Sequence, residues 1–176
     1  MTMKSQETTP DMHSDRLLLR RPKAEDFESY QRFYQDPEAS HFYGGPLDKK
    51  RIWNRLASDI GHWELRGYGV WAVQASGYDR CVGVCGFAWP EGWPRPELTW
   101  WITSEARRKG IAFEASTLAI KWAQQHNRDL LQTHMKDENS AARGLAVKLG
   151  GVKIARELFP DGIERDIFEF PSVRQR

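Results

Sequence analysis

Segments of two different hydrophobic periodicities alternate along almost the whole of this 176-residue chain. Short apolar runs bounded by glycine, proline or aspartate predict strands, and longer stretches with an apolar residue every three or four positions predict helices. The predicted strands are 16–21, 70–75, 81–88, 97–103, 130–135, 152–159 and 163–170, and the predicted helices are 24–35, 48–67, 110–126 and 139–149. The resulting order, β-α-α-β-β-β-α-β-α-β-β, predicts a single α/β domain in which helices cover the faces of a mixed sheet.

The first 14 residues are polar and carry no apolar run, which predicts a flexible N-terminal tail ahead of one domain at 15–172. We find neither an internal repeat nor a linker long enough to divide that domain. The tail lacks the apolar segment of a secretory signal, and no apolar run approaches the roughly 18 residues that a membrane helix needs. The formal net charge of +2 is too small to predict a nucleic-acid partner. We therefore expect a protein without nucleic-acid or membrane partners.

The chain has two cysteines, Cys81 and Cys85, on one predicted strand. Four residues of extended chain span about 13 Å, which is too far for a disulfide or a shared metal ion. Reduced, partly buried thiols are therefore expected, together with a cytoplasmic location and no bound metal.

A basic turn separates the predicted strand 97–103 from the predicted helix 110–126, and its sequence is Arg107-Arg108-Lys109-Gly110-Ile111-Ala112. The start of a helix presents N–H groups without intrahelical partners, and three adjacent cations favour phosphate. Gly110 lets the backbone approach a ligand closely, and Ala112 is too small to block that approach. A pyrophosphate site and a solvated basic turn both fit this pattern. The motifs of P-loop hydrolases and of dinucleotide-binding enzymes are absent from the sequence.

The spacing Arg107-x-x-Gly110-x-Ala112 resembles the Arg/Gln-x-x-Gly-x-Gly/Ala turn of the GNAT acetyltransferases. Further segments resemble the branch that acetylates the N-termini of ribosomal proteins, and these are 15–20, Asp36-Pro37-Glu38, the strand at Glu97, Glu114-Ala115 and Asn139 through Gly150. The resemblance runs from about residue 15 to about residue 170. It implies a mostly antiparallel sheet and an acetyl-CoA-dependent N-acetyltransferase in which a primary amine attacks the thioester directly. A protein N-terminus and a small-molecule amine are both possible acceptors, and a non-catalytic acyl-CoA-binding module is the alternative.

In this superfamily the fourth and fifth strands splay apart, and the pantetheine arm of acetyl-CoA lies in the gap. The resemblance places that gap between 97–103 and 130–135, with a main-chain N–H of the first strand stabilising the oxyanion. The residues implied to contact acetyl-CoA are Trp101, Ile102, Thr103, Arg107, Arg108, Lys109, Gly110, Ile111, Ala112, Asn139 and Arg143. A solvated helix face explains Arg143, and also Lys148, equally well.

The resemblance also implies a general base, because a protonated amine cannot attack. Glu97 aligns with the strand glutamate that several branches use, and it should share a face with Thr99 and Trp101. An ordinary strand glutamate is the alternative. The general acid is unidentified, because alanines, Ala146 and Ala142, stand where relatives carry a tyrosine and a serine. Ser140 is a candidate acid, and His134 is another.

Eight tryptophans are unusual in a chain of this length, and several lie beside glycine and proline in predicted loops. An aromatic wall formed by Phe42, Tyr43, Trp89 and Trp93 is the candidate acceptor site, and core packing of the same side chains is the alternative. The expected partners are acetyl-CoA and an amine acceptor, and the protein is expected to be a monomer or a homodimer.

Overall fold

The computed structural model describes residues 10–126 and 128–172. The strands are β1 (Met12–His13), β2 (Leu17–Arg20), β3 (Val70–Ala75), β4 (Gly83–Ala88), β5 (Glu97–Ile102), β6 (Gln132–Met135), β7 (Val152–Leu158) and β8 (Glu164–Glu169). The α-helices are α1 (Phe27–Tyr34), α2 (Lys49–Arg66), α3 (Ile111–Gln125) and α4 (Ser140–Lys148), and the 3-10 turns are η1 (Ala24–Asp26), η2 (His41–Tyr43) and η3 (Ser104–Ala106). The predicted order of elements and the α/β class are confirmed.

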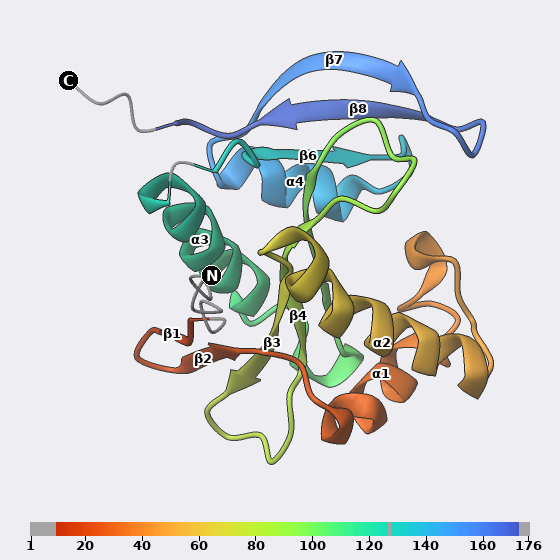
Figure 1. The fold of residues 1–176 in the computed structure, drawn as a ribbon, viewed down its shortest axis with the longest axis vertical. Coiled ribbons are helices and arrows are strands. Elements are labelled where there is room, and N and C mark those ends of the chain that lie inside the picture. The colour runs from red at the N-terminus through yellow and green to blue at the C-terminus, as the bar shows by residue number, and fades with distance from the viewer. Residues whose placement is uncertain (1–9, 127, 173–176) are drawn as a thin grey trace, which may run out of the picture.

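The strands form two antiparallel sheets, of order β1-β2-β3-β4-β5 and β6-β8-β7. Tight turns at glycines with positive φ, Gly77 and Gly162, connect β3 to β4 and β7 to β8. In Figure 1 the three-stranded sheet crosses the top of the molecule, above the larger sheet. The two sheets meet where β5 and β6 lie side by side, because Thr133 Oγ1 on β6 donates to Leu98 O on β5 at 2.8 Å.

Helices cover both faces of the larger sheet (Figure 1). On one face, α1 and α2 pack aromatic and aliphatic residues against β3, β4 and β5, and this layer is Tyr30, Phe33, Ile52, Leu56, Val70, Val84 and Trp101. On the other face, α3 presents the small residues Ala115, Ala119 and Ala123, which let it lie close against β2, β4 and β5. α4 packs beside β6.

The predicted limit of the N-terminal tail is wrong. Met12 and His13, placed in the tail by their polar neighbours, form β1 and pair with Leu19 and Leu18. Trp71 Nε1 also donates to Pro10 O at 2.9 Å, so the chain from residue 10 onward is tied to the sheet. A two-residue strand is too short to give a periodic signal, which is why the sequence pattern missed it. Residues 1–9 of the predicted tail lie outside the described residues.

Both cysteines are buried and free, as expected. Within the described ranges, no helix is long and apolar enough to cross a membrane.

Candidate active site

The predicted gap between strands is confirmed as a break between the two sheets, with β5 at the edge of one and β6 at the edge of the other. Main-chain groups alternate in direction along an antiparallel strand. Thr103 N donates to Val82 O beyond the end of β4, and Trp101 pairs with Val84 on β4. The main chain of Leu98, Trp100 and Ile102 therefore faces the open edge of β5.

This alternation corrects part of the predicted acetyl-CoA site. The main chains of Trp101 and Thr103 are directed toward β4, so only Ile102 of the predicted three faces the gap. Trp100, which the resemblance did not single out, faces it too. The side chain of Trp101 is stacked on Phe33 at 4.5 Å in the core, and Thr103 is buried. Hydrophobic periodicity gives no information on which edge of a strand is paired, so sequence reasoning could not distinguish Trp100 from Trp101.

All three carbonyls on this open edge already have partners, and that of Leu98 accepts from Thr133 Oγ1 on β6. Arg107 Nε donates to Ile102 O at 3.1 Å, and the hydroxyl of Tyr43 donates to Trp100 O. Tyr43 was predicted as an acceptor-site residue, and its hydroxyl therefore lies against the strand edge. The N–H groups of Leu98, Trp100 and Ile102 point to the same side, and those of Trp100 and Ile102 lie nearest the turn before α3.

The basic turn ends at the N-terminus of α3. Gly110 is the N-cap with φ +76°, a left-handed conformation that glycine adopts without strain. No side chain caps the helix, and its first hydrogen bond runs from Glu114 N to Gly110 O. The N–H groups of Ile111, Ala112 and Phe113 are therefore available for an anion. This geometry fits the predicted phosphate site.

The three basic side chains of the turn are not equivalent. Besides its bond to Ile102 O, Arg107 donates to Ala39 O at 3.1 Å, so its guanidinium holds the turn against the segment after α1. Lys109 Nζ donates to the Tyr78 hydroxyl at 2.6 Å and to Glu105 O at 3.0 Å. Arg108, at φ 58°, is exposed. Sequence reasoning assigned all three to phosphate, whereas the structure uses Arg107 and Lys109 to hold the turn.

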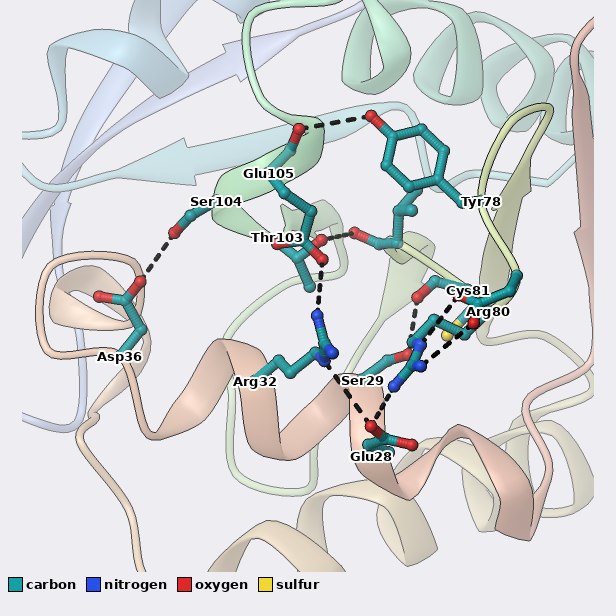
Figure 2. Close-up of polar contacts among 12 residues, drawn as sticks. Glu28, Ser29, Arg32, Asp36, Tyr78, Arg80, Cys81, Thr103, Ser104 and Glu105 are labelled. Atoms are coloured by element: carbon teal, nitrogen blue, oxygen red, sulfur yellow. Dashed lines mark hydrogen bonds and ion pairs between the residues drawn. The ribbon is translucent and has the colours of Figure 1, made fainter.

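Further polar contacts hold η3, the segment just before the basic turn (Figure 2). Ser104 Oγ donates to Asp36 Oδ2 at 2.7 Å, and the Tyr78 hydroxyl donates to Glu105 O at 3.3 Å. Arg32 on α1 lies 3.5 Å from the carboxylate of Glu105. The turn is thus held from α1 and from the β3–β4 connection at the same time.

A cavity of about 1540 Å³ opens between α2, the loops after α1 and after β4, β5, β6 and the β7–β8 turn. Its walls include Phe42, Tyr43, Trp89, Trp93, Glu97, Trp101 and Asn139 of the residues that the sequence singled out. All four predicted acceptor residues are therefore brought together. The turn 107–112, Ser140 and Arg143 are not among its walls.

The side chain of Glu97 lines this cavity and is 20% exposed. It lies on the α1–α2 face with Thr99 and Trp101, as the alternation of strand side chains predicts. Burial raises the pKa of Glu97 to about 8, and the charge of Arg165 opposes this increase. Such a carboxyl group accepts a proton readily near neutral pH.

His134 lies beside Glu97, with its Nε2 3.1 Å from Glu97 Oε2. Burial is the main cause that lowers the pKa of His134 to about 3, and the charges of Arg165 and Arg95 contribute. The Glu97 carboxyl and the His134 imidazole are both neutral at pH 7 in this state.

Arg165 is a site residue that sequence reasoning missed. Its side chain on β8 is mostly buried, and its guanidinium binds both carboxylate oxygens of Asp161 at 2.8 and 2.7 Å. It also lies over the rings of Trp93 and Phe159. Only the hairpin turn at 160–162 marked this region in the sequence, and a turn motif does not indicate that its arginine points into a cavity.

The residues around α4 make contacts other than those that the resemblance implies. Asn139 caps the helix, because its side chain accepts from Ala142 N at 3.2 Å, and it also reaches the cavity. Ser140 is exposed outside the cavity, which removes the geometric basis for its role as the acid.

The basic residues of α4 are held by other contacts. Arg143 Nη1 is ion-paired with Asp166 at 2.6 Å, so the predicted contact of Arg143 with phosphate stays a prediction. Lys148 lies over the Phe113 ring at 4.4 Å.

The structure is similar to solved acetyltransferases at low sequence identity. An acetyltransferase from Agrobacterium tumefaciens str. C58 matches with a TM-score of 0.83 at 22% identity, over 98% of this chain and 100% of that one. A ribosomal L7/L12 alpha-N-protein acetyltransferase in complex with coenzyme A matches with a TM-score of 0.70 at 12% identity, over 90% and 96%. A microcin C7 self immunity acetyltransferase in complex with acetyl-CoA and AMP matches with a TM-score of 0.67 at 10% identity, over 88% and 92%.

A family model described as an acetyltransferase (GNAT) domain matches residues 16–152, which is well over half of the chain. The matched segment runs from β2 to the start of β7 and so contains the open edge of β5, the turn before α3 and the catalytic candidate Glu97. The protein belongs to the GNAT acetyltransferase family.

Proposed function

We propose that the protein transfers the acetyl group of acetyl-CoA to a primary amine by direct attack of that amine. The observation that most supports the proposal is where the two ends of β5 lie. Glu97 begins this strand inside the cavity, and the strand leads through the 103–110 turn to the open N-terminus of α3. The six residues of the strand span about 17 Å, so an extended arm along its free edge can join a phosphate group to a reacting centre.

Acetyl-CoA supplies an activated acetyl thioester. The N–H groups of Trp100 and Ile102 are positioned to bind its extended arm along the open edge of β5. Backbone N–H groups from the turn before α3 and from the first turn of the helix bind the pyrophosphate, with Arg108 free to add charge. In this arrangement Arg107 and Lys109 keep the turn in its binding conformation.

Glu97 acts as the base. An amine bound as ammonium must lose a proton before it can attack, and a carboxylate with a pKa of about 8 takes that proton at slightly basic pH. The mostly buried position of the side chain excludes most of the water that would otherwise compete for the proton.

The cavity supports an acceptor larger than a simple amine. Its volume exceeds the roughly 300–1,000 Å³ of pockets that hold drug-sized ligands, and its walls are aromatic near the loops. A protein N-terminus fits these dimensions, and the resemblance to the ribosomal L7/L12 enzyme favours it. A small-molecule amine is the alternative acceptor.

The proposal is tested with purified protein, acetyl-CoA, and a panel of peptides with free N-termini together with small amines. Release of the coenzyme A thiol is followed, and the acetylated product is identified by mass spectrometry. We expect amine-dependent release and a mass increase of one acetyl group on the acceptor. Tight binding of acetyl-CoA without release for any amine would instead identify a non-catalytic acyl-CoA-binding module.

A further inference from the structure

His134 on β6 is a buried histidine whose Nε2 has no hydrogen-bond partner in the described part of the chain. Its side chain is 4% exposed and forms part of the cavity wall beside Glu97. The 3.1 Å between Nε2 and Glu97 Oε2 is hydrogen-bonding distance, although the two groups are not aligned for a bond. Buried polar atoms are almost always paired, so an unpaired one in a cavity points to a bond that forms during function. Catalytic hydrogen bonds are often misaligned before the substrate binds.

Burial is the main reason that the His134 ring stays neutral, and the charges around it contribute. Arg165 on β8 and Arg95 in the loop before β5 disfavour a second positive charge, and Asp161 in the β7–β8 turn opposes them only partly. The ring also lies 4.5 Å from that of Phe159, which adds an apolar neighbour. A neutral imidazole nitrogen that carries no hydrogen is an acceptor only.

In the tautomer that carries the ring hydrogen on Nδ1, the close contact between His134 and Glu97 is favourable in only one protonation state of the glutamate. With the ring hydrogen on Nδ1, an ionised Glu97 brings a carboxylate oxygen against the lone pair of Nε2, and two acceptors at this distance repel. A protonated Glu97 can instead direct its O–H to Nε2. Such a hydrogen bond to the neutral acid raises the pKa of Glu97 and makes its carboxylate a stronger base.

We propose that His134 is the positioning residue of the base, accepting the hydrogen bond of the Glu97 carboxylic acid that forms when Glu97 deprotonates the acceptor ammonium. The inference rests on the proposed function. One N–H bond of the ammonium breaks and leaves its electron pair on nitrogen, and one O–H bond forms on Glu97. The proton stays in the O–H···Nε2 hydrogen bond until water removes it after product release.

The test compares the pH dependence of kcat/KM in three variants at position 134. His134→Leu removes the acceptor, His134→Asn keeps a polar group that is too short to reach Glu97, and His134→Gln can place an amide oxygen near the position of Nε2. In the Leu and Asn variants we expect the acidic limb of the kcat/KM profile to move to lower pH by about one unit. The plateau value of kcat/KM should fall roughly tenfold. His134→Gln should restore most of both. His126→Gln is the control, because His126 is exposed at the end of α3 and should leave the profile unchanged.

Two further measurements separate this inference from the proposed function. Carbon NMR titration of the Glu97 carboxyl in the free protein requires no turnover, and its pKa should be lower in His134→Leu and His134→Asn than in the wild type. In a Glu97→Gln background, the same substitutions should change kcat/KM by less than about twofold, because the two residues act as one unit. An unchanged Glu97 pKa, or the full tenfold loss in the Glu97→Gln background, would overturn the proposal. A wild type that titrates as expected but acetylates no amine would overturn the proposed function alone.

Discussion

At the scale of single residues, the site depends on how few polar contacts Glu97 has. The buried carboxylates Asp26 and Asp166 are bound to arginine, Asp26 to Arg20 at 2.7 Å and Asp166 to Arg143 at 2.6 Å, and their pKa values are lowered. Glu97 has no arginine within ion-pair distance in the described residues, and burial dominates its pKa. The same chain therefore contains structural carboxylates that stay ionised and, at Glu97, a carboxyl group that can exchange a proton near neutral pH.

Replacing Glu97 by glutamine tests this difference. The wild-type kcat/KM should rise as pH increases through about 8, because only the ionised carboxylate accepts a proton. Glu97→Gln should lose roughly 10²-fold near pH 8, and the loss should shrink at higher pH, where the free amine needs no base. Acetyl-CoA affinity should stay the same. An effect confined to KM would indicate that Glu97 only positions the acceptor.

The folded stability of the same variant gives a second readout. Because the pKa of Glu97 is raised on folding, its stabilising contribution is complete below its unfolded pKa and is lost as pH rises through about 8. Glu97→Gln cannot ionise, so it should melt above the wild type at pH 9 and close to it at pH 5. Equal melting temperatures at pH 9 would contradict the raised pKa.

At the scale of elements, the sequence predicted nearly all the helices and strands, because each long element has a clear hydrophobic period and ends at glycine, proline or a cap such as Asp48. Through the resemblance it also predicted the position of the gap between the sheets, and the assignment of the turn before α3 to phosphate stays a prediction. The edge of β5 that is free, the burial of Arg165 and the use of Arg107 to hold the turn were not predictable. These depend on contacts between segments far apart in the sequence, such as that of Arg107 with Ala39, 68 residues away, which local patterns do not record.

The start of α3 provides the sharpest test of acetyl-CoA binding. At 100-fold excess over its Kd, acetyl-CoA should raise the melting temperature by about 5–10 °C, and desulfo-CoA should do nearly the same. Gly110→Asp adds a negative charge to the phosphate site and strains a left-handed position, so it should abolish the shift. Gly77→Asp is the matched control, since it makes the same change at φ +87° in an open turn. A normal shift in Gly110→Asp would contradict the phosphate site.

The ion pairs that join α4 to the three-stranded sheet should matter for stability in a pH-dependent way. Asp166 on β8 binds Lys153, Arg143 and Arg156, and the hydrogen bond from Lys153 is the main cause that lowers its pKa to about 2. A depressed carboxyl pKa stabilises the fold above its unfolded value and loses that contribution as pH falls through about 2.

Asp166→Asn should therefore lower the free energy of unfolding by about 1–3 kcal/mol at pH 7 in urea titrations, and the difference from the wild type should shrink toward pH 2. The control is Asp79→Asn, which removes an equal charge from an exposed pair with Arg80 and should lower the free energy of unfolding much less. Equal losses in both variants would show that burial of Asp166 adds nothing.

At the scale of the whole molecule, the small net charge of +2 conceals an uneven distribution. Within the cavity wall, Arg66 is paired with Glu91 and Arg165 with Asp161. Three basic side chains of the wall, Arg51, Arg55 and Lys136, have no ion pair in the described part of the chain, and Glu97 is neutral at pH 7. Asp59 is the remaining carboxylate of the wall, with burial raising its pKa to about 6.

This positive excess predicts the ranking of acceptors. A polyamine such as spermidine brings several positive charges toward Arg51 and Arg55, whereas a peptide with acidic residues after its N-terminus brings charges that these arginines attract. Among peptides of equal length, the acidic one should have a KM about 3- to 10-fold below that of the basic one at low salt. This difference in KM should become smaller as salt screens the charges.

Arg51→Gln combined with Arg55→Gln should reduce the difference in KM between the two peptides at low salt. Acetyl-CoA affinity should not change, because neither arginine lies in the phosphate turn. Arg108→Gln is the opposite control, since it should weaken acetyl-CoA binding and leave the ranking of peptides intact. Spermidine turnover above that of every peptide would place the acceptor outside this cavity, because no arrangement of its unpaired cations favours a polycation.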